Sequence, residues 1–245
     1  MSSMASPHPL PRGRRTSLAG FTILELLVVV ALIAGMAVFA LPAFSSLQKS
    51  SQLTQSGQRI LDTLVLTRQR ALTSGRNFEI RFYKFQDKDL PGGTPYYKAM
   101  QVFEETGRSD TGGNPIFEPV GRLYKLPNSV MIDQGSPWGN EWYSLSTIVN
   151  PSDSGNSREE PSSNIRRNEE KVQINKNLKQ GTDFTFTRLK FRPSGGIDLD
   201  PDLSWYFTIR DPQSGADGLT AIENVPNYIT FQLEPYTGIA RLFRP

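Results

Sequence analysis

One acidic side chain stands alone in a long apolar stretch near the start of the sequence. Glu25 is the only charged residue between positions 21 and 44. An ionisable group in such a stretch is costly unless it reaches water or meets an opposite charge. If a helix begins near position 21, the carboxylate can reach water in the favourable field of the helix N-terminus. Alternatively, cleavage after Gly20 would free an α-amino group on Phe21, and the Glu25 carboxylate of one copy could pair with the ammonium group of a neighbour.

Other residue types that commonly do chemistry are scarce. The chain has a single histidine, His8, and no cysteine. Beyond residue 20 this excludes His-assisted nucleophiles, thiol chemistry and His-ligated zinc sites. The sequence has neither a glycine-rich phosphate loop nor a dinucleotide-binding fingerprint. We therefore expect no catalytic residues, no cofactor and no enzymatic activity.

Three aspartates, Asp198, Asp200 and Asp202, have the spacing of the first ligands of a calcium loop. The glycine that such a loop requires is absent, and its twelfth position falls on Ile209, which cannot coordinate a metal. A turn with solvated aspartates is the favoured interpretation. We expect no metal site, with these three residues as a weak calcium candidate.

The apolar stretch is long enough to place Glu25 in a membrane. As a helix, residues 21–44 would extend about 36 Å, against a hydrocarbon core of roughly 30 Å. Residues 1–20 contain Arg12, Arg14 and Arg15 and no acid, so they read as a basic flank on the cytoplasmic side. The sequence thus predicts a single membrane span at 21–44.

The segment Gly20-Phe21-Thr22-x-x-Glu25, behind a short basic leader and before about nineteen apolar residues, resembles the prepilin signature of type IV pilins and type II secretion pseudopilins. The resemblance implies that Gly20 precedes the cleavage site and that Phe21 becomes the N-methylated first residue. It also implies that Glu25 acts in subunit assembly and that Pro42 kinks the helix.

This resemblance further implies location and partners. The protein would reside in a bacterial inner membrane, with its N-terminus cytoplasmic and its globular domain periplasmic, and then enter a periplasmic or surface filament. Its partners would be a prepilin peptidase and N-methyltransferase, other pilin or pseudopilin subunits, an inner-membrane assembly platform and membrane lipid.

Two C-terminal segments carry a second resemblance. Residues 191–196 (Phe-Arg-Pro-Ser-Gly-Gly) and 235–241 (Pro-Tyr-Thr-Gly-Ile-Ala-Arg) resemble turns of H-type minor pseudopilins and FimT-type fimbrial subunits. Segments 43–47, 81–83 and 99–103 also resemble a pilin-like group called Verru_Chthon cassette protein D. This narrower resemblance would assign the chain to a more specific family but would add nothing about its mechanism.

The remaining sequence predicts an α+β fold in which a long helix packs on a mainly antiparallel sheet. We expect a leader at 1–20, the membrane span at 21–44, an amphipathic continuation of the helix at 45–75 and a β-rich domain at 76–245. Apolar and polar residues alternate at 78–83, 205–210 and 229–234, which predicts strands with one buried face. Weaker strand candidates are 98–103, 121–126, 130–133, 145–149 and 184–191, with a bulge between Phe186 and Leu189 and a hairpin turn at 234–238.

The segment 150–182 is rich in serine and charged residues and poor in large apolar ones, which predicts a mobile surface loop. It is either a solvated insertion or a contact to a substrate or neighbouring subunit. The whole chain has 27 Lys and Arg against 24 Asp and Glu, and three of the arginines lie in the leader. The processed protein would be neutral, so DNA is an unlikely partner.

We therefore expect a structural minor pilin or pseudopilin subunit. The alternative is a membrane-anchored surface module that binds DNA or another ligand through its loops or through Arg241 and Arg244.

Overall fold

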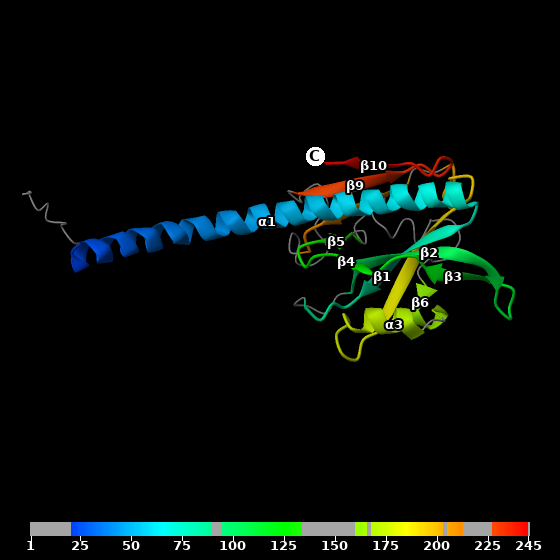
Figure 1. The fold of residues 1–245 in the computed structure, drawn as a ribbon, viewed down its shortest axis with the longest axis horizontal. Helices are drawn as coiled ribbons and strands as arrows, with labels where there is room; N and C mark the ends of the chain where they lie inside the picture. Colours follow the sequence, from blue (N-terminus) through cyan, green and yellow to red (C-terminus); the bar gives the residue numbers. More distant parts are fainter. Residues whose placement is uncertain are drawn as a thin grey trace, which may run out of the picture. The chain divides into compact units, whose positions relative to one another are not determined.

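The computed structural model describes residues 21–89, 95–133, 160–165, 168–202, 205–212 and 227–244. The chain divides into two compact units, Met1–Ser45 and Ser46–Pro245. One helix, α1 (Ile23–Ser74), enters both, and the second unit also contains the sheet (Figure 1).

Helix α1 includes the continuation that the sequence predicts after residue 45. It ends where Gly75, at φ 66°, donates its N–H to the carbonyl of Ala71 at 3.1 Å. A glycine with positive φ is a common end of a helix because it lacks the Cβ that would make this conformation costly. Over the described residues, no helix combines the length and the hydropathy that a membrane crossing requires. The side chains at 38–43 lie outside the described part of the chain, so the kink at Pro42 stays a prediction.

The strands of the second unit form one antiparallel sheet among the described residues. Its order is β10-β9-β8-β5-β2-β1-β7-β6, with β3 and β4 also pairing to β2. The bounds are β1 (Phe78–Phe85), β2 (Tyr96–Ser109), β3 (Pro115–Pro119), β4 (Tyr124–Lys125), β5 (Met131–Ile132), β6 (Glu160–Pro161), β7 (Phe184–Phe191), β8 (Trp205–Arg210), β9 (Tyr228–Leu233) and β10 (Ala240–Phe243). An α+β fold with a helix on an antiparallel sheet is therefore confirmed.

Several strands differ in extent from the prediction. β2 extends to Ser109, beyond the strand candidate at 98–103, and its second half pairs antiparallel with β3. The candidates at 121–126 and 130–133 shrink to the two-residue strands β4 and β5. The candidate at 145–149 lies outside the described residues. The turn between β9 and β10 has the expected chemistry, since Gly238, at φ 68°, donates its N–H to the carbonyl of Glu234 at 2.7 Å.

The bulge predicted between Phe186 and Leu189 is wrong. β7 pairs with β1 in an unbroken register, and the shift in β1 occurs at Tyr83 and Lys84, opposite β2. The alternation of apolar and polar residues is irregular in β7 because both faces of the strand are covered. Phe186 and Thr187, which are adjacent and face opposite sides, are both buried. A strand with both faces buried does not need a polar residue at every second position, so its sequence loses the regular alternation of apolar and polar residues.

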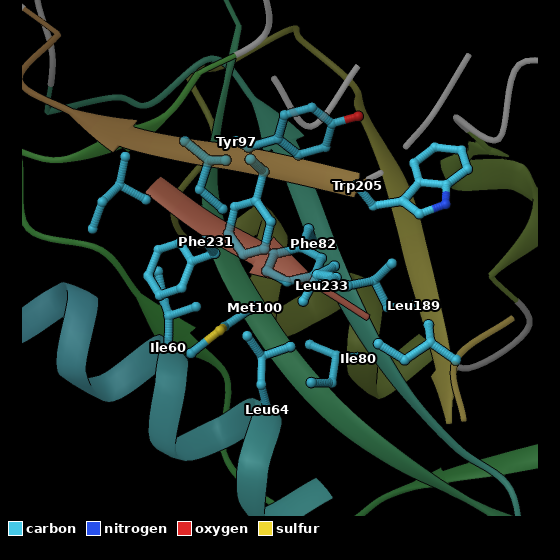
Figure 2. Close-up of a cluster of buried hydrophobic side chains, with 14 of the residues drawn as sticks. Ile60, Leu64, Ile80, Phe82, Tyr97, Met100, Leu189, Trp205, Phe231 and Leu233 are labelled. Carbon is cyan, nitrogen blue, oxygen red and sulfur yellow. The ribbon is translucent and has the colours of Figure 1, made fainter. Parts of the chain in front are cut away.

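Helix α1 covers one face of the sheet. Ile60 and Leu64 point from the helix toward Ile80, Phe82 and Met100 (Figure 2). The rings of Phe207 and Phe231 stack in the same core at 4.7 Å. Val65 and Leu72, which the helical pattern groups with these core residues, are instead exposed.

A second small core covers the opposite face of β1 and β7. It comprises the short helices η2 (Ser162–Asn164) and α3 (Asn168–Asn175) and a cluster of buried apolar residues, namely Tyr83, Phe85, Ala99, Ile165, Ile174, Phe184 and Phe186. Figure 1 shows α1 and α3 on opposite sides of β1 and β2.

The interpretation of 150–182 as a mobile surface loop is wrong for its described part, residues 160–165 and 168–182. β6 pairs with β7, and Ile165 and Ile174 are fully buried. These two isoleucines anchor the segment, although the polar residues around them make the whole stretch look solvated in sequence. We call this packed segment, residues 160–165 and 168–175, the sheet cover.

Candidate functional site

The N-terminal end of α1 brings together Phe21, Thr22 and Glu25. The Thr22 hydroxyl donates to Glu25 Oε2 at 2.9 Å, and the backbone N–H of Thr22 donates to the same oxygen at 2.9 Å. In return, the backbone N–H of Glu25 donates to Thr22 Oγ1 at 3.2 Å. This reciprocal pattern is a capping box, which satisfies donors that the start of a helix leaves without partners.

The capping box leaves half of the Glu25 carboxylate available. All the hydrogen bonds from Thr22 reach Oε2, and Oε1 accepts none from the described residues. The side chains around it are apolar and exposed; Phe21 is 84% exposed. The site can therefore hold a cation brought by another molecule, while the surrounding surface requires an apolar partner.

The sequence motif already contained the capping signal. Thr followed three residues later by Glu, immediately before an apolar run, is typical of a helix N-terminus. The position of the carboxylate near the helix start was expected, whereas its reciprocal bonding with Thr22 was missed. Gly20 lies outside the described residues.

The three candidate calcium ligands do not converge. Asp198 forms an ion pair with Arg192 at 3.1 Å. Asp200 Oδ1 accepts the N–H of Asp202 at 3.0 Å, and the Asp200 carbonyl accepts Trp205 Nε1–H at 2.7 Å. Across the described ranges, no group of three or more His, Cys, Asp or Glu side chains could hold a metal ion. These bonds define an exposed turn.

The two C-terminal arginines proposed for ligand binding have different environments. Arg244 donates to Thr54 Oγ1 at 2.8 Å and to Ser50 Oγ and Asn227 Oδ1, both at 3.1 Å. It therefore ties the end of the chain to α1. Arg241 is exposed. The structure thus does not combine them into a site for an anionic ligand.

A buried ionic cluster, which sequence reasoning missed, joins the sheet cover to β1. Arg81 donates to Glu79 Oε1 at 2.8 Å and to Glu170 Oε2 at 2.9 Å. The Tyr83 hydroxyl also donates to Glu170, and the guanidinium group lies 4.0 Å from the ring centre of Phe103. Glu79, Arg81 and Tyr83 alternate with Phe78, Ile80 and Phe82, so the pattern indicated that they face water.

The charges in this cluster stabilise one another. Burial disfavours the charged form of Arg81, but the carboxylates of Glu79 and Glu170 outweigh it and raise the pKa of Arg81. Burial raises the pKa of Tyr83, and the negative charge of Glu170 raises it further. Tyr83 is thus a neutral donor and Arg81 a permanent cation. The cluster is suited to holding α3 on the sheet and offers no nucleophile.

A hollow of about 600 Å³ lies beside this cluster. Arg81, Arg188, Glu160 and Glu170 line it, and Arg188 pairs with Glu160 at 3.0 Å. Since Glu170 pairs with Arg81, these four charges are internally matched. Asp110, Lys190 and Asp198 also line the hollow, so charges of both signs surround it.

No protein-family model matches the chain, and no curated protein matches its sequence. Among solved structures, the chain resembles the type IV minor pilin FimU of Pseudomonas aeruginosa, with 11% identity, a TM-score of 0.35, and coverage of 80% of this chain and 89% of FimU. It also resembles the minor pseudopilin EpsH of the Vibrio cholerae type 2 secretion system, with 12% identity, a TM-score of 0.37, and coverage of 79% of this chain and 98% of EpsH. A second EpsH structure gives 11% identity, a TM-score of 0.35, and coverage of 80% and 96%.

At these identities and TM-scores the likeness identifies no function. The resemblance to the Verru_Chthon cassette protein D group stays a prediction.

Proposed function

We propose that this protein is a structural, non-catalytic subunit of a type IV pilus-like or type II secretion filament. The observation that carries the proposal is the N-terminal end of α1. There a single carboxylate, with one oxygen that accepts no hydrogen bond from the described residues, lies among exposed apolar side chains and four residues after Phe21. A surface of this composition needs lipid or other apolar helices to cover it.

In this proposal a prepilin peptidase cleaves between Gly20 and Phe21 in a bacterial inner membrane. Cleavage removes the basic leader and frees the α-amino group of Phe21, which is then N-methylated. Residues 21–44 anchor the processed chain, and the domain from residue 76 onward is periplasmic. An assembly platform moves the subunit from the membrane into the filament.

Within the filament, the apolar segments of neighbouring subunits cover one another. Glu25 Oε1 accepts the ammonium group of Phe21 from an adjacent copy or related subunit, while Oε2 keeps its bonds to Thr22. Pairing is favoured because either charge alone would be buried without compensation in apolar surroundings.

The mature N-terminus tests the processing step. With a prepilin peptidase present, mass spectrometry of the purified protein should show a chain that begins at methylated Phe21. A leader-retaining control is the Gly20→Val variant, in which a branched side chain replaces the glycine before the bond to be cut. A wild-type chain that begins anywhere else contradicts the proposal.

Two matched variants separate local capping from assembly. Glu25→Gln can keep the capping hydrogen bonds, because glutamine serves in a capping box, but it removes the charge. Thr22→Val removes the cap and keeps the charge. We expect Glu25→Gln to be processed yet to enter filaments at least about tenfold less, because it leaves an ammonium group unpaired in apolar surroundings.

The Thr22→Val variant should still enter filaments in this assay. Quantitative immunoblotting of sheared filaments against the membrane fraction measures the difference. Normal incorporation of Glu25→Gln would contradict the pairing.

A further inference from the structure

A groove of about 190 Å³ lies between α1 and the sheet, where β3 and β4 separate along β2. On the helix side it is lined by Arg59, Asp62, Thr63, Leu66, Thr67 and Arg70. Counted from Arg59, these residues follow the pattern i, i+3, i+4, i+7, i+8 and i+11, so they form one stripe along α1. Arg122 and Gln101 contribute from the sheet side. We call this feature the arginine groove.

The arginine groove has more positive than negative charge. Arg59 lies over the ring of Tyr124 at 5.7 Å. The guanidinium groups of Arg70 and Arg122 make neither a hydrogen bond nor an ion pair with the described residues, although the Arg70 backbone carbonyl accepts hydrogen bonds from Thr73 and Ser74. The single acid, Asp62, accepts a hydrogen bond from Gln58 at 2.8 Å.

A neighbouring surface lacks this imbalance. There, Arg76 pairs with Glu104 at 3.0 Å and Arg108 pairs with Glu118 at 2.9 Å. The arginines of that surface are therefore neutralised within the chain, whereas those of the arginine groove would attract an anionic partner.

A buried acceptor in the same groove also lacks a partner. Gln101 is 3% exposed and donates through Nε2 to the carbonyl of Gly121 at 2.8 Å, but its Oε1 has no hydrogen-bond partner among the described residues. An unpaired buried acceptor costs free energy.

The chain itself carries a complementary segment. In the acidic turn at 198–202, Asp200 and Asp202 are exposed, and neither makes an ion pair with the described residues. Asp198 pairs with Arg192 and so anchors the turn to its own subunit. The two remaining carboxylates complement the arginines of the groove in sign and approximate number.

We propose that the arginine groove of one copy binds the acidic turn of a second copy. The proposal rests on the filament-subunit function and names one contact within that filament. Groove and turn are different surfaces, so the contact is heterologous. A heterologous contact that does not close into a ring generates an open helical array.

The absence of native cysteine allows a direct test in the full-length processed protein. One tagged copy carries Gly121→Cys, at an exposed position beside the groove where an added Cβ meets nothing within 4 Å. A differently tagged copy carries Pro201→Cys, between the two exposed aspartates. Because each copy has one thiol, a disulfide between the two tags can form only between molecules. Ser109→Cys, at an exposed position at the end of β2, replaces Gly121→Cys in the control.

We expect a disulfide-linked dimer from the Gly121→Cys and Pro201→Cys pair and none from the control pair. Adding Arg70→Glu and Arg122→Glu to the groove copy should lower the cross-linked fraction about fivefold or more, since like charges then face one another. Adding Asp200→Lys and Asp202→Lys to the other copy should restore it.

The outcomes distinguish this contact from the filament function itself. Normal filaments without the cross-link, a cross-link that ignores charge reversal, or a groove thiol linked only to a different subunit would each overturn the proposed contact and leave the filament function standing. A protein that is neither cleaved before Phe21 nor found in filaments would overturn both.

Discussion

The two faces of β1 are both covered but have opposite chemistry. Phe78, Ile80 and Phe82 face α1 within an apolar core, whereas Glu79, Arg81 and Tyr83 face the sheet cover. Glu79 and Phe82 are both 0% exposed. The apolar face is stable without specific partners, because removal from water is enough. On the other face, the small apolar core around Ile165 and Ile174 is joined by buried charges, and these charges are tolerated only because each meets another, in particular through Glu170.

The largest expected effect comes from the apolar face. Phe82→Ala should lower the free energy of unfolding by about 3–5 kcal/mol, because it removes a fully buried ring and leaves a cavity. Chemical denaturation monitored by circular dichroism measures this loss. The matched control is Phe243→Ala in β10, where the ring is half exposed and the loss should be much smaller. Equal losses for the two variants would show that α1 and the sheet do not form the main core.

Removal of one charged partner from the polar face should lower the free energy of unfolding nearly as much. Glu170→Ala leaves Arg81 and the Tyr83 hydroxyl without their buried acceptor, so we expect a loss of about 3 kcal/mol. Relative to the wild type, amide hydrogen exchange in this variant should accelerate more in α3 than in α1. The control is Lys171→Ala, a neighbouring change that removes no contact in the cluster.

A triple variant sharpens this comparison. Replacing Glu79, Arg81 and Glu170 together with methionine removes every charge of the cluster at once, so it should cost much less than Glu170→Ala alone. If the triple variant is less stable than Glu170→Ala, the ionic contacts contribute more free energy to folding than the burial of their charges costs.

Lys98 offers a third kind of buried charge, a cation with no carboxylate of the described residues at hydrogen-bond distance. Its ammonium group donates to the carbonyls of Val130 at 2.6 Å and Pro127 at 2.9 Å. Burial lowers the pKa of Lys98 to about 8, from an ordinary value of 10.5. Between these two values the unfolded chain binds the proton and the folded protein does not, so stability should rise with pH.

We expect this rise to amount to about 2–3 kcal/mol between pH 8 and pH 10.5. Denaturation midpoints across that interval measure it, with Lys98→Met as the reference because other groups also titrate there. The stability of the wild type relative to this variant should therefore rise over the interval and be constant well below pH 8. A constant difference throughout would mean that the carbonyls compensate the charge fully.

Local features of this chain were predictable because their causes are local. The start of α1 depends on Thr22 and Glu25, three residues apart, and the turn at Gly238 depends on a glycine that tolerates positive φ. The strands β1, β8 and β9 follow from alternation, since one of their faces meets α1. The membrane span, the cleavage after Gly20 and the kink at Pro42 stay predictions from the sequence.

The tertiary structure alone decided which polar residues are buried. Arg81 and Glu170 are 89 positions apart, and no periodicity within β1 or α3 shows that they meet. The sheet cover turned an alternating strand into one buried on both faces. Separately, the packing of α1 on the sheet placed Arg70 and Arg122 in one groove. Local sequence fixes where helices and turns begin because short-range sterics and hydrogen bonds govern them, whereas burial of charge depends on a partner that only folding brings near.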